Sequence, residues 1–199
     1  TCENLAAECG LIRSGCDETL DCGVCDPSMR CSGEYTCVDC ADSAEPTTES
    51  DPLHLGTESD IPDSNVVRYA TLHDADDEDW YSIQINDRSP RIVPGGGPPN
   101  VTVTVSDLPA GITPSLQVRF ACDSGMLSYN CGSGSSNDGG GRCSNTATSG
   151  ANSVSVFHDL DCLPNDGDDA DGRMWIRVTS VEHPGASLCG TYQLRVRVQ

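Results

Sequence analysis

From residue 66 to residue 198, apolar and polar residues alternate along much of the chain. Residues in such an alternation point in turn to the two faces of a β-strand, so one face can enter a core while the other meets water. The segments with this pattern are 66–72, 80–85, 101–105, 116–120, 154–157, 174–178 and 192–198. Turn-forming residues separate them. The pattern predicts an all-β fold, a β-sandwich of seven or eight short strands without a convincing helix.

One stretch of this region, residues 124–152, lacks the alternation and is rich in glycine, serine and asparagine. Long loops inside compact domains are usually functional or disordered. Because Cys122, Cys131 and Cys143 can tie this stretch down, the sequence predicts an ordered loop here.

The first forty residues show little periodicity but hold eight of the thirteen cysteines. So short a segment buries too little apolar surface to fold without disulfides or a metal. Two C-x-x-C pairs, Cys22/Cys25 and Cys37/Cys40, are compatible with zinc. The regular spacing of the other cysteines favours a disulfide-rich module over residues 1–40, and therefore an oxidising compartment.

The pairing of the cysteines is open at this stage, since eight cysteines alone allow ~105 pairings. Thirteen is odd, so one cysteine is expected to bridge the two parts, to stay free or to join another chain. The set is Cys2, Cys9, Cys16, Cys22, Cys25, Cys31, Cys37, Cys40, Cys122, Cys131, Cys143, Cys162 and Cys189.

Between the two cysteine-bearing parts, residues 41–65 contain seven acidic residues, three prolines and no lysine or arginine. This composition predicts an extended acidic linker that forms no core of its own. Leu53 and Leu55 could nevertheless anchor part of it to the sandwich, which is expected over residues 66–199.

Two resemblances accompany these patterns. The cysteine-rich segment is similar to short repeats of secreted myxobacterial proteins, with matches at Cys9-Gly10, Gly15-Cys16, Thr19-Leu20, Cys22-Gly23, Cys25 and Cys31. It departs from them where Asp17-Glu18 replaces two glycines and where Asp26 precedes Pro27. This resemblance implies an extracellular spacer.

The second resemblance covers residues 60–199. DADDEDWYSI at 74–83, GRMWIRV at 172–178 and GTYQLRV at 190–196 resemble signature segments of bacterial pre-peptidase C-terminal domains. The resemblance implies a jelly-roll-like sandwich appended to secreted enzymes or surface proteins, of which some bind polymers and some bind calcium. Trp175 replaces an expected tyrosine, and five cysteines are additional.

The net charge of −20 argues against nucleic acid and anionic membranes as partners. No segment reaches the ~20 apolar residues of a membrane helix, so membrane insertion is not expected. A removed leader or a further segment is expected before Thr1, with an extracellular or cell-surface location.

Two acidic clusters are candidate cation sites. Carboxylates gathered in one loop suit Ca²⁺, and the first cluster consists of Asp74, Asp76, Asp77 and Glu78. Chance clustering in an acidic protein is the alternative, and Asp79 is expected to cap a turn. The second cluster, residues 165–172, lacks the ligand positions of an EF-hand and predicts a solvated turn.

Four arginines fall on the polar faces of their predicted strands: Arg119, Arg177, Arg195 and Arg197. If their strands share a sheet, they form a cationic surface for an acidic glycan or for the protein's own acidic linker. Neutralisation by neighbouring carboxylates is the alternative.

Enzymatic motifs are absent from the sequence: none of the four histidines lies in H-E-x-x-H, and there is no G-x-S-x-G. We therefore expect no enzyme but an extracellular binding or accessory module that recognises a polymer, glycan or protein. The alternative is a structural subunit of a surface assembly, including self-assembly or a covalent contact between chains. A hydrolase built around His158 or His183 is a third reading.

Overall fold

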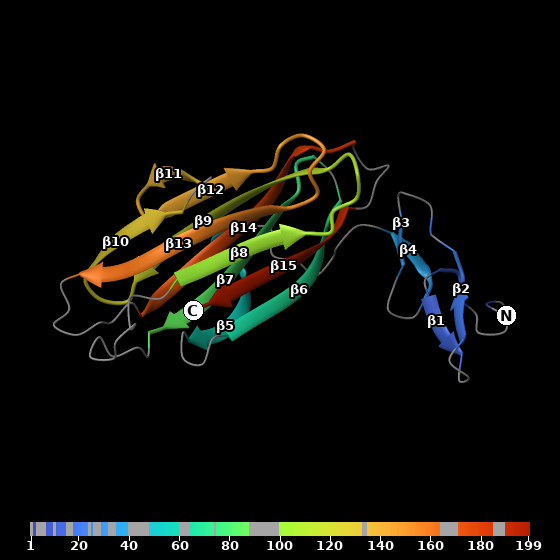
Figure 1. Cartoon of the computed structure of the whole chain (residues 1–199), viewed down its shortest axis with the longest axis horizontal. Helices are drawn as coiled ribbons and strands as arrows, with labels where there is room; N and C mark the ends of the chain where they lie inside the picture. Colours follow the sequence, from blue (N-terminus) through green and yellow to red (C-terminus); the bar gives the residue numbers. More distant parts are fainter. Residues whose placement is uncertain are drawn as a thin grey trace.

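The computed structural model contains a cysteine-rich N-terminal part and a β-sandwich (Figure 1). It describes residues 2, 7–9, 11–14, 18–23, 25, 29–31, 35–39, 48–59, 64–73, 75–87, 100–132, 135–163, 171–184 and 190–199. Strands β1 to β15 make up the regular structure of this described part. Within it, no helix has the length and apolar character that a membrane span needs. The predicted all-β fold is confirmed.

The N-terminal part holds two antiparallel hairpins. They are β1 (Leu11–Ser14) with β2 (Glu18–Asp21), and β3 (Met29–Cys31) with β4 (Cys37–Asp39). Disulfides join Cys2 to Cys22 and Cys25 to Cys37. Cys9 is buried and is also disulfide-bonded. The expected disulfide-rich module is confirmed, whereas Cys16, Cys40 and Cys189 lie outside the described residues.

Two sheets form the sandwich. The five-stranded sheet has the order β10 (Met126–Cys131), β13 (Val154–Leu163), β8 (Asn100–Ser106), β15 (Gly190–Val198), β6 (Ser64–Leu72). The six-stranded sheet has the order β11 (Ser136–Gly139), β12 (Arg142–Thr146), β9 (Thr113–Cys122), β14 (Gly172–Glu182), β7 (Glu78–Asn86), β5 (Leu53–Ser59). All strand pairs of these two sheets are antiparallel except β5 with β7. All seven alternating segments lie in strands, as predicted.

The strand order is that of a jelly roll. From β6 to β9 each strand lies in the other sheet from the one before it, and the chain then returns through β13 to β15. The last strand, β15, lies between β6 and β8, while β14 lies between β7 and β9. Strand β5 is added in parallel beside β7.

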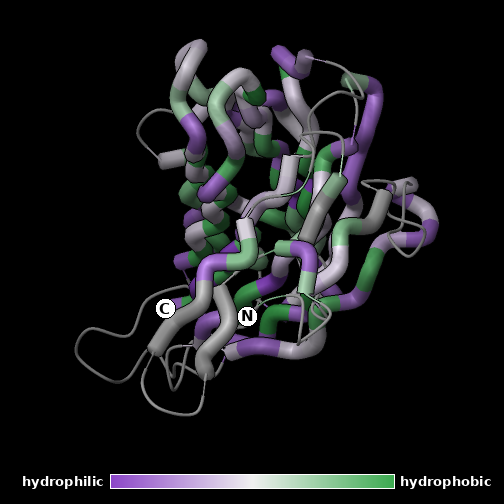
Figure 2. The backbone as a smooth tube through the Cα atoms, turned by 90° about the vertical axis from the view of Figure 1, so that its right-hand side faces the viewer, coloured by the Kyte–Doolittle hydropathy of each residue, from purple (hydrophilic) through white to green (hydrophobic). Residues whose placement is uncertain are grey.

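The core lies between the inward faces of the two sheets. In Figure 2, hydrophobic and hydrophilic segments alternate along the strands, as the sequence pattern requires. Fully buried side chains from both sheets meet there, among them Tyr81, Ile83, Val118, Ile176 and Leu194. Cys122–Cys162 and Cys131–Cys143 each join one sheet to the other.

Two glycines begin the strands that carry the last two signature segments, 172–178 and 190–196. A Cβ on Gly172 would collide with the backbone oxygen of Ala121 and the ring of Phe120. A Cβ on Gly190 would lie 2.7 Å from the backbone oxygen of Leu72. Glycine at both positions lets β14 and β15 approach their neighbours closely.

Two segments differ from the expectations. Residues 124–152 are not a loop, because β10, β11 and β12 lie within them and pair with neighbouring strands. Residues 53–59, in the expected linker, form β5, and Leu53 and Leu55 pack against the core as anticipated. Mostly polar sequences form these strands because they lie at or near sheet edges, where much of each strand faces water.

Candidate functional site

The outer face of the six-stranded sheet gathers aromatic and cationic side chains. In β7, β9 and β14, alternate residues point away from the core and are only partly exposed. The strand register places Trp175 opposite Arg119, and Arg177 opposite both Gln117 and Trp80. Arg119 is in turn opposite Arg142 of β12. Two indole rings and three guanidinium groups therefore lie side by side across four neighbouring strands.

These side chains line a hollow of about 210 Å³, here called the Trp/Arg hollow. It contains both tryptophans of the protein and three of its eleven basic residues. The lining residues are Glu49, Trp80, Gln117, Arg119, Arg142, Trp175 and Arg177. In a protein of net charge −20, this is a local reversal of sign. Shallow sites with aromatic walls and a few directed polar groups are typical of ligand recognition.

Arg119 is the central cation of the hollow. Its guanidinium carbon lies 4.4 Å from the ring centroid of Trp175, a cation–π distance. Arg119 Nη1 lies 2.9 Å from Glu49 Oε1, and the two side chains are about one third exposed. Arg119 Nε is buried and, among the described residues, has no hydrogen-bond partner. The stacked ring holds the guanidinium in place while part of its donor capacity stays unused.

Arg177 is held from two sides. Its guanidinium carbon lies 5.7 Å from the Trp80 ring, and it forms an ion pair with Glu78 through Nη2 and a 3.1 Å hydrogen bond through Nε. Trp80 Nε1 donates to the same carboxylate at 3.1 Å. The hydrogen bond from Arg177 is the main cause that lowers the pKa of Glu78, with burial opposing it. Glu78 thus stays charged and fixes this wall of the hollow.

The four arginines proposed as one cationic surface are divided by the fold. Arg119 and Arg177 lie on the six-stranded sheet, whereas Arg195 and Arg197 are exposed on β15 of the five-stranded sheet. The condition that their strands share one sheet is therefore not met. Arg142, which sequence reasoning missed, joins the first pair instead, because β12 was taken for a loop.

The carboxylates proposed for calcium lie in different surroundings. Asp77 is buried, and its Oδ2 accepts the His73 backbone N–H at 2.8 Å and lies 2.7 Å from His73 Nδ1. Glu78, the next residue, points to the outer face, where it contacts Arg177. Asp76 is exposed, and Asp74 lies outside the described residues. Asp77 and Glu78, two of the four carboxylates, thus have different surroundings although they are neighbours in sequence.

Calcium binding by this segment stays a prediction with a simple test. If Asp74, Asp76, Asp77 and Glu78 hold Ca²⁺, the metal binds only the folded state, so excess Ca²⁺ raises the thermal midpoint and EDTA lowers it again. Scanning calorimetry of calcium-loaded protein with and without EDTA measures this. An unchanged midpoint contradicts the prediction.

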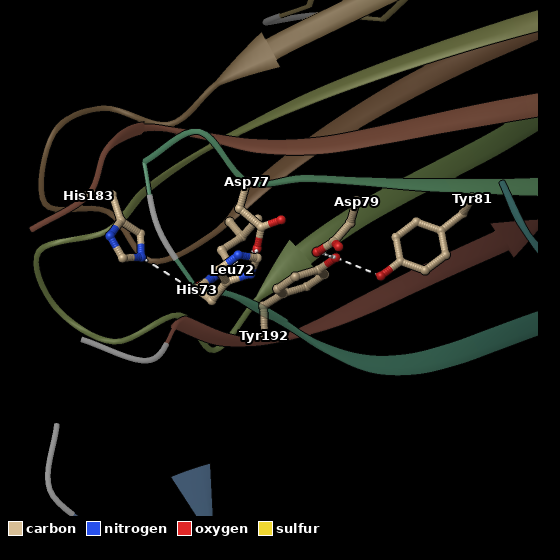
Figure 3. Close-up of polar contacts among 7 residues, drawn as sticks. All are labelled: Leu72, His73, Asp77, Asp79, Tyr81, His183 and Tyr192. Carbon is tan, nitrogen blue, oxygen red and sulfur yellow. Dashed lines mark hydrogen bonds and ion pairs between the residues drawn. The ribbon is translucent and has the colours of Figure 1, made fainter. Parts of the chain in front are cut away.

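A buried polar chain lies inside the sandwich, where the first and last signature segments meet (Figure 3). Tyr192 donates to Asp79 Oδ2 at 2.6 Å, and the hydroxyls of Tyr81 and Tyr192 are 2.7 Å apart. All three side chains are at most 2% exposed. Burial, followed by the charge of Asp79, raises the pKa of Tyr192 well above its ordinary value. Sequence reasoning assigned Asp79 to a local turn. In the structure its carboxylate also joins the two sheets through Tyr192, and Asp77 accepts the backbone N–H of His73.

One group of sulfur atoms has metal-like proximity. Ligand atoms of Cys9, Cys25 and Cys37 lie within 4.8 Å of one another, the single such group found among the described residues. Cys25 and Cys37 are joined to each other and Cys9 is also oxidised, so none offers the thiolate that zinc needs. The group is a disulfide cluster.

Among the described residues, one histidine contacts a serine as a base would contact a nucleophile: His54 lies beside Ser82. Their Oγ and Nδ1 atoms are 3.3 Å apart on the outer face of β7 and β5. Ser82 is only 3% exposed, and in the described part of the chain no carboxylate contacts His54. A substrate therefore has little access to the hydroxyl, and the histidine lacks an acidic partner to orient it.

His158, once considered for catalysis, is fully buried. Its ring stacks on Tyr129 at 5.4 Å, and its Nε2 is 3.1 Å from the Gly141 carbonyl oxygen, to which it donates. Burial lowers the pKa of His158, against smaller opposing effects of the Gly141 and Asp159 backbones and the Asp159 charge. Its geometry is that of a structural link between β13 and the β11–β12 turn.

A pH dependence follows from His158. Because the folded state favours the neutral ring, the unfolded chain binds more protons below the ordinary pKa of 6.5, and the free energy of unfolding falls as the pH drops through that value. Urea denaturation between about pH 7.5 and about pH 5 measures the slope. His158→Gln is expected to flatten it, whereas the exposed His54→Gln leaves it as in wild type. Equal slopes for all three proteins would contradict this assignment.

No family model, curated protein or solved structure matches the chain.

Proposed function

We propose that the protein is a non-catalytic extracellular binding or accessory module whose sandwich holds a polymeric ligand in the Trp/Arg hollow. The cysteine-rich part serves as a spacer that presents the sandwich. The observation that carries this proposal is the collection of both tryptophans and three arginines on one outer face. On an ordinary solvated face, large aromatic rings have no reason to gather with cations.

The chemistry of the hollow suits an extended ligand. An indole face attracts the polarised C–H groups of a sugar ring as well as cations. Gln117 and the guanidinium groups add directed donors for hydroxyl or acidic groups. The hollow spans several strands of the outer face. An internal stretch of a polymer can therefore bind there, and no free chain end has to be inserted.

The compartment is supported by the cysteines. Disulfides in both parts of the chain require an oxidising environment, which the sequence had led us to expect. A secreted or cell-surface location is the usual setting of that chemistry. We also propose that the sandwich is related to pre-peptidase C-terminal domains and the cysteine-rich part to the myxobacterial repeats. A bacterial origin is part of the same proposal. The jelly-roll order and the direct pairing of β7 with β14 are compatible with these relationships.

Affinity electrophoresis against a panel of neutral and acidic polysaccharides tests the function. We expect at least one polymer to retard the protein, and Trp80→Ala/Trp175→Ala to weaken this binding by about tenfold or more, as for central aromatic contacts elsewhere. Tyr69→Ala is the matched control, because Tyr69 is an aromatic residue, 68% exposed, on the five-stranded sheet.

Two results would contradict this function. If the double tryptophan variant is still retarded as strongly as wild type, the hollow is not the binding site. Absence of retardation by every polymer would argue against a polymer-binding module.

A second candidate, a structural subunit, is favoured by one observation. Strand β6 is a nine-residue edge strand that exposes Val67 and Tyr69. Long edges with apolar side chains can pair with another copy, although charged Arg68 between these residues works against pairing. Sedimentation at increasing concentration, with and without reductant, distinguishes this candidate. Concentration-dependent assembly that Tyr69→Ala abolishes would support it over the binding module.

A further inference from the structure

The Trp/Arg hollow already contains one carboxylate of the chain itself. Glu49 lies 70 positions before Arg119 and reaches it from the segment that precedes β5. A compact turn presents Glu49, since the Asp51 backbone N–H lies 3.2 Å from both the backbone oxygen and Oγ1 of Thr48. The turn is closed by its own hydrogen bonds, so Glu49 is free to leave Arg119 without unfolding the turn.

The hollow has more arginine side chains than carboxylates of the described residues that pair with them. Glu49 contacts Arg119 and Glu78 contacts Arg177, but among the described residues no carboxylate pairs with Arg142. Arg142 is exposed and is the register partner of Arg119 on the adjacent strand. These two arginines lie side by side at the ~4.8 Å spacing of neighbouring strands.

From this geometry we propose that the hollow binds a polysaccharide that bears carboxylates, and that Glu49 occupies the place of one ligand carboxylate until the polymer displaces it. This inference rests on the proposed function and names its ligand class and an internal competitor. Guanidinium forks match planar carboxylates, and neighbouring forks match successive charged sugars. The tryptophans supply surfaces for the sugar rings, which an acidic peptide does not need.

The negative net charge does not prevent this binding. At an ionic strength of about 0.15 M the Debye length is ~8 Å, so charges elsewhere on the protein are largely screened from a ligand in the hollow. Groups in direct contact are screened much less. The local arginines therefore decide the sign of the interaction.

Isothermal titration of the full chain with oligogalacturonate tests the ligand class, and its neutral methyl ester is the control ligand. We expect the acidic oligomer to bind at least about tenfold more tightly than the ester, since hydrogen bonds between charged partners are the stronger ones. Arg119→Ala/Arg142→Ala should remove this preference. Arg195→Ala/Arg197→Ala makes the same change of charge on the other sheet and should keep it.

Glu49→Gln tests the internal competitor. Loss of an exposed ion pair is expected to tighten oligogalacturonate binding by about two- to fivefold. Asp51→Asn removes the same charge from the same turn without touching Arg119, so it should have little effect. Equal tightening by both variants would show a general charge effect and overturn the competitor role.

Three further outcomes would overturn the ligand class. In the first, the acidic oligomer and its ester bind equally, and binding is lost in Trp80→Ala/Trp175→Ala. That result would leave the proposed function in place but show that carboxylates of the ligand are not recognised. Tighter binding of poly-glutamate than of oligogalacturonate would identify an acidic peptide as the ligand. No binding of oligogalacturonate to wild type or to Glu49→Gln would overturn the inference directly, whatever the polysaccharide panel shows.

Discussion

Replacing Cys122 and Cys162 together by alanine is expected to lower the free energy of unfolding by about 4 kcal/mol. The disulfide between them closes a loop of sequence separation 40 and joins β9 of one sheet to β13 of the other. Removing it restores the conformational entropy of that loop to the unfolded chain. Cys162 is also nearly fully buried, so packing is lost as well.

The second inter-sheet disulfide provides the matched comparison. Cys131–Cys143 has a sequence separation of only 12, and its removal by the same double substitution should cost about 3 kcal/mol. Chemical denaturation of both variants and wild type measures the difference. A larger loss for the shorter loop would mean that packing around Cys143, which is fully buried, outweighs loop entropy.

The Cys122–Cys162 disulfide also lies close in sequence to the proposed binding site. Cys122 ends β9, the strand that carries Gln117 and Arg119, and it is the register partner of Gly172 at the start of β14. Both strands contribute walls of the Trp/Arg hollow. Where the variant is still folded, however, these strands keep their pairing, so we expect its ligand affinity to match wild type.

The strands of the sandwich could be predicted because each has an apolar face that must enter the core. Val101, Val103 and Val105 are all fully buried, as their alternation requires. The same reasoning failed for β10 to β12 and β5. Their stability comes from backbone pairing, disulfides and a few anchors such as Leu53, and such contacts leave little trace in local periodicity.

The candidate site was predictable only in part. Arg119 and Arg177 were found because alternation assigns them to polar faces, but the sheet order decides which arginines meet, and pairing between distant strands cannot be obtained from local sequence. Trp80 and Trp175 were noticed as parts of a resemblance and not as walls of one hollow. A cation–π interaction needs the register between two strands, which no single segment contains.

Asp79 illustrates the same limit inside the core. Local reasoning placed it in a turn, because acidic residues before a strand usually accept backbone N–H groups. One of its partners, Tyr192, is 113 residues away on the other sheet. Only the packing of the two sheets brings the carboxylate and the hydroxyl together.

Tyr192→Phe is expected to lower the free energy of unfolding by about 2 to 4 kcal/mol. The hydroxyl of Tyr192 has one proton and gives it to Asp79, so the proton in its 2.7 Å contact with Tyr81 must come from Tyr81. The substitution therefore removes a hydrogen bond to a buried carboxylate and the acceptor of a second buried hydroxyl. Chemical denaturation near pH 7 measures the loss.

Tyr81→Phe is the matched control, since it deletes an equally buried hydroxyl but leaves the bond from Tyr192 to Asp79 intact. A loss of about 1 kcal/mol is expected, as for one neutral hydrogen bond. Equal losses for the two variants would mean that the bond to Asp79 contributes nothing beyond an ordinary hydroxyl contact.

The pH dependence of the free energy of unfolding at alkaline pH tests the same buried polar chain independently. Burial and the charge of Asp79 raise the pKa of Tyr192, so the folded state keeps its proton above pH 10, where an unfolded tyrosine loses it. The unfolded state then binds fewer protons, and the stability of wild type falls as the pH rises above that value. Tyr192→Phe has no such proton, so its free energy of unfolding should fall less steeply there and the gap to wild type should narrow. A constant gap would show that Tyr192 ionises alike in both states, in conflict with its burial beside a carboxylate.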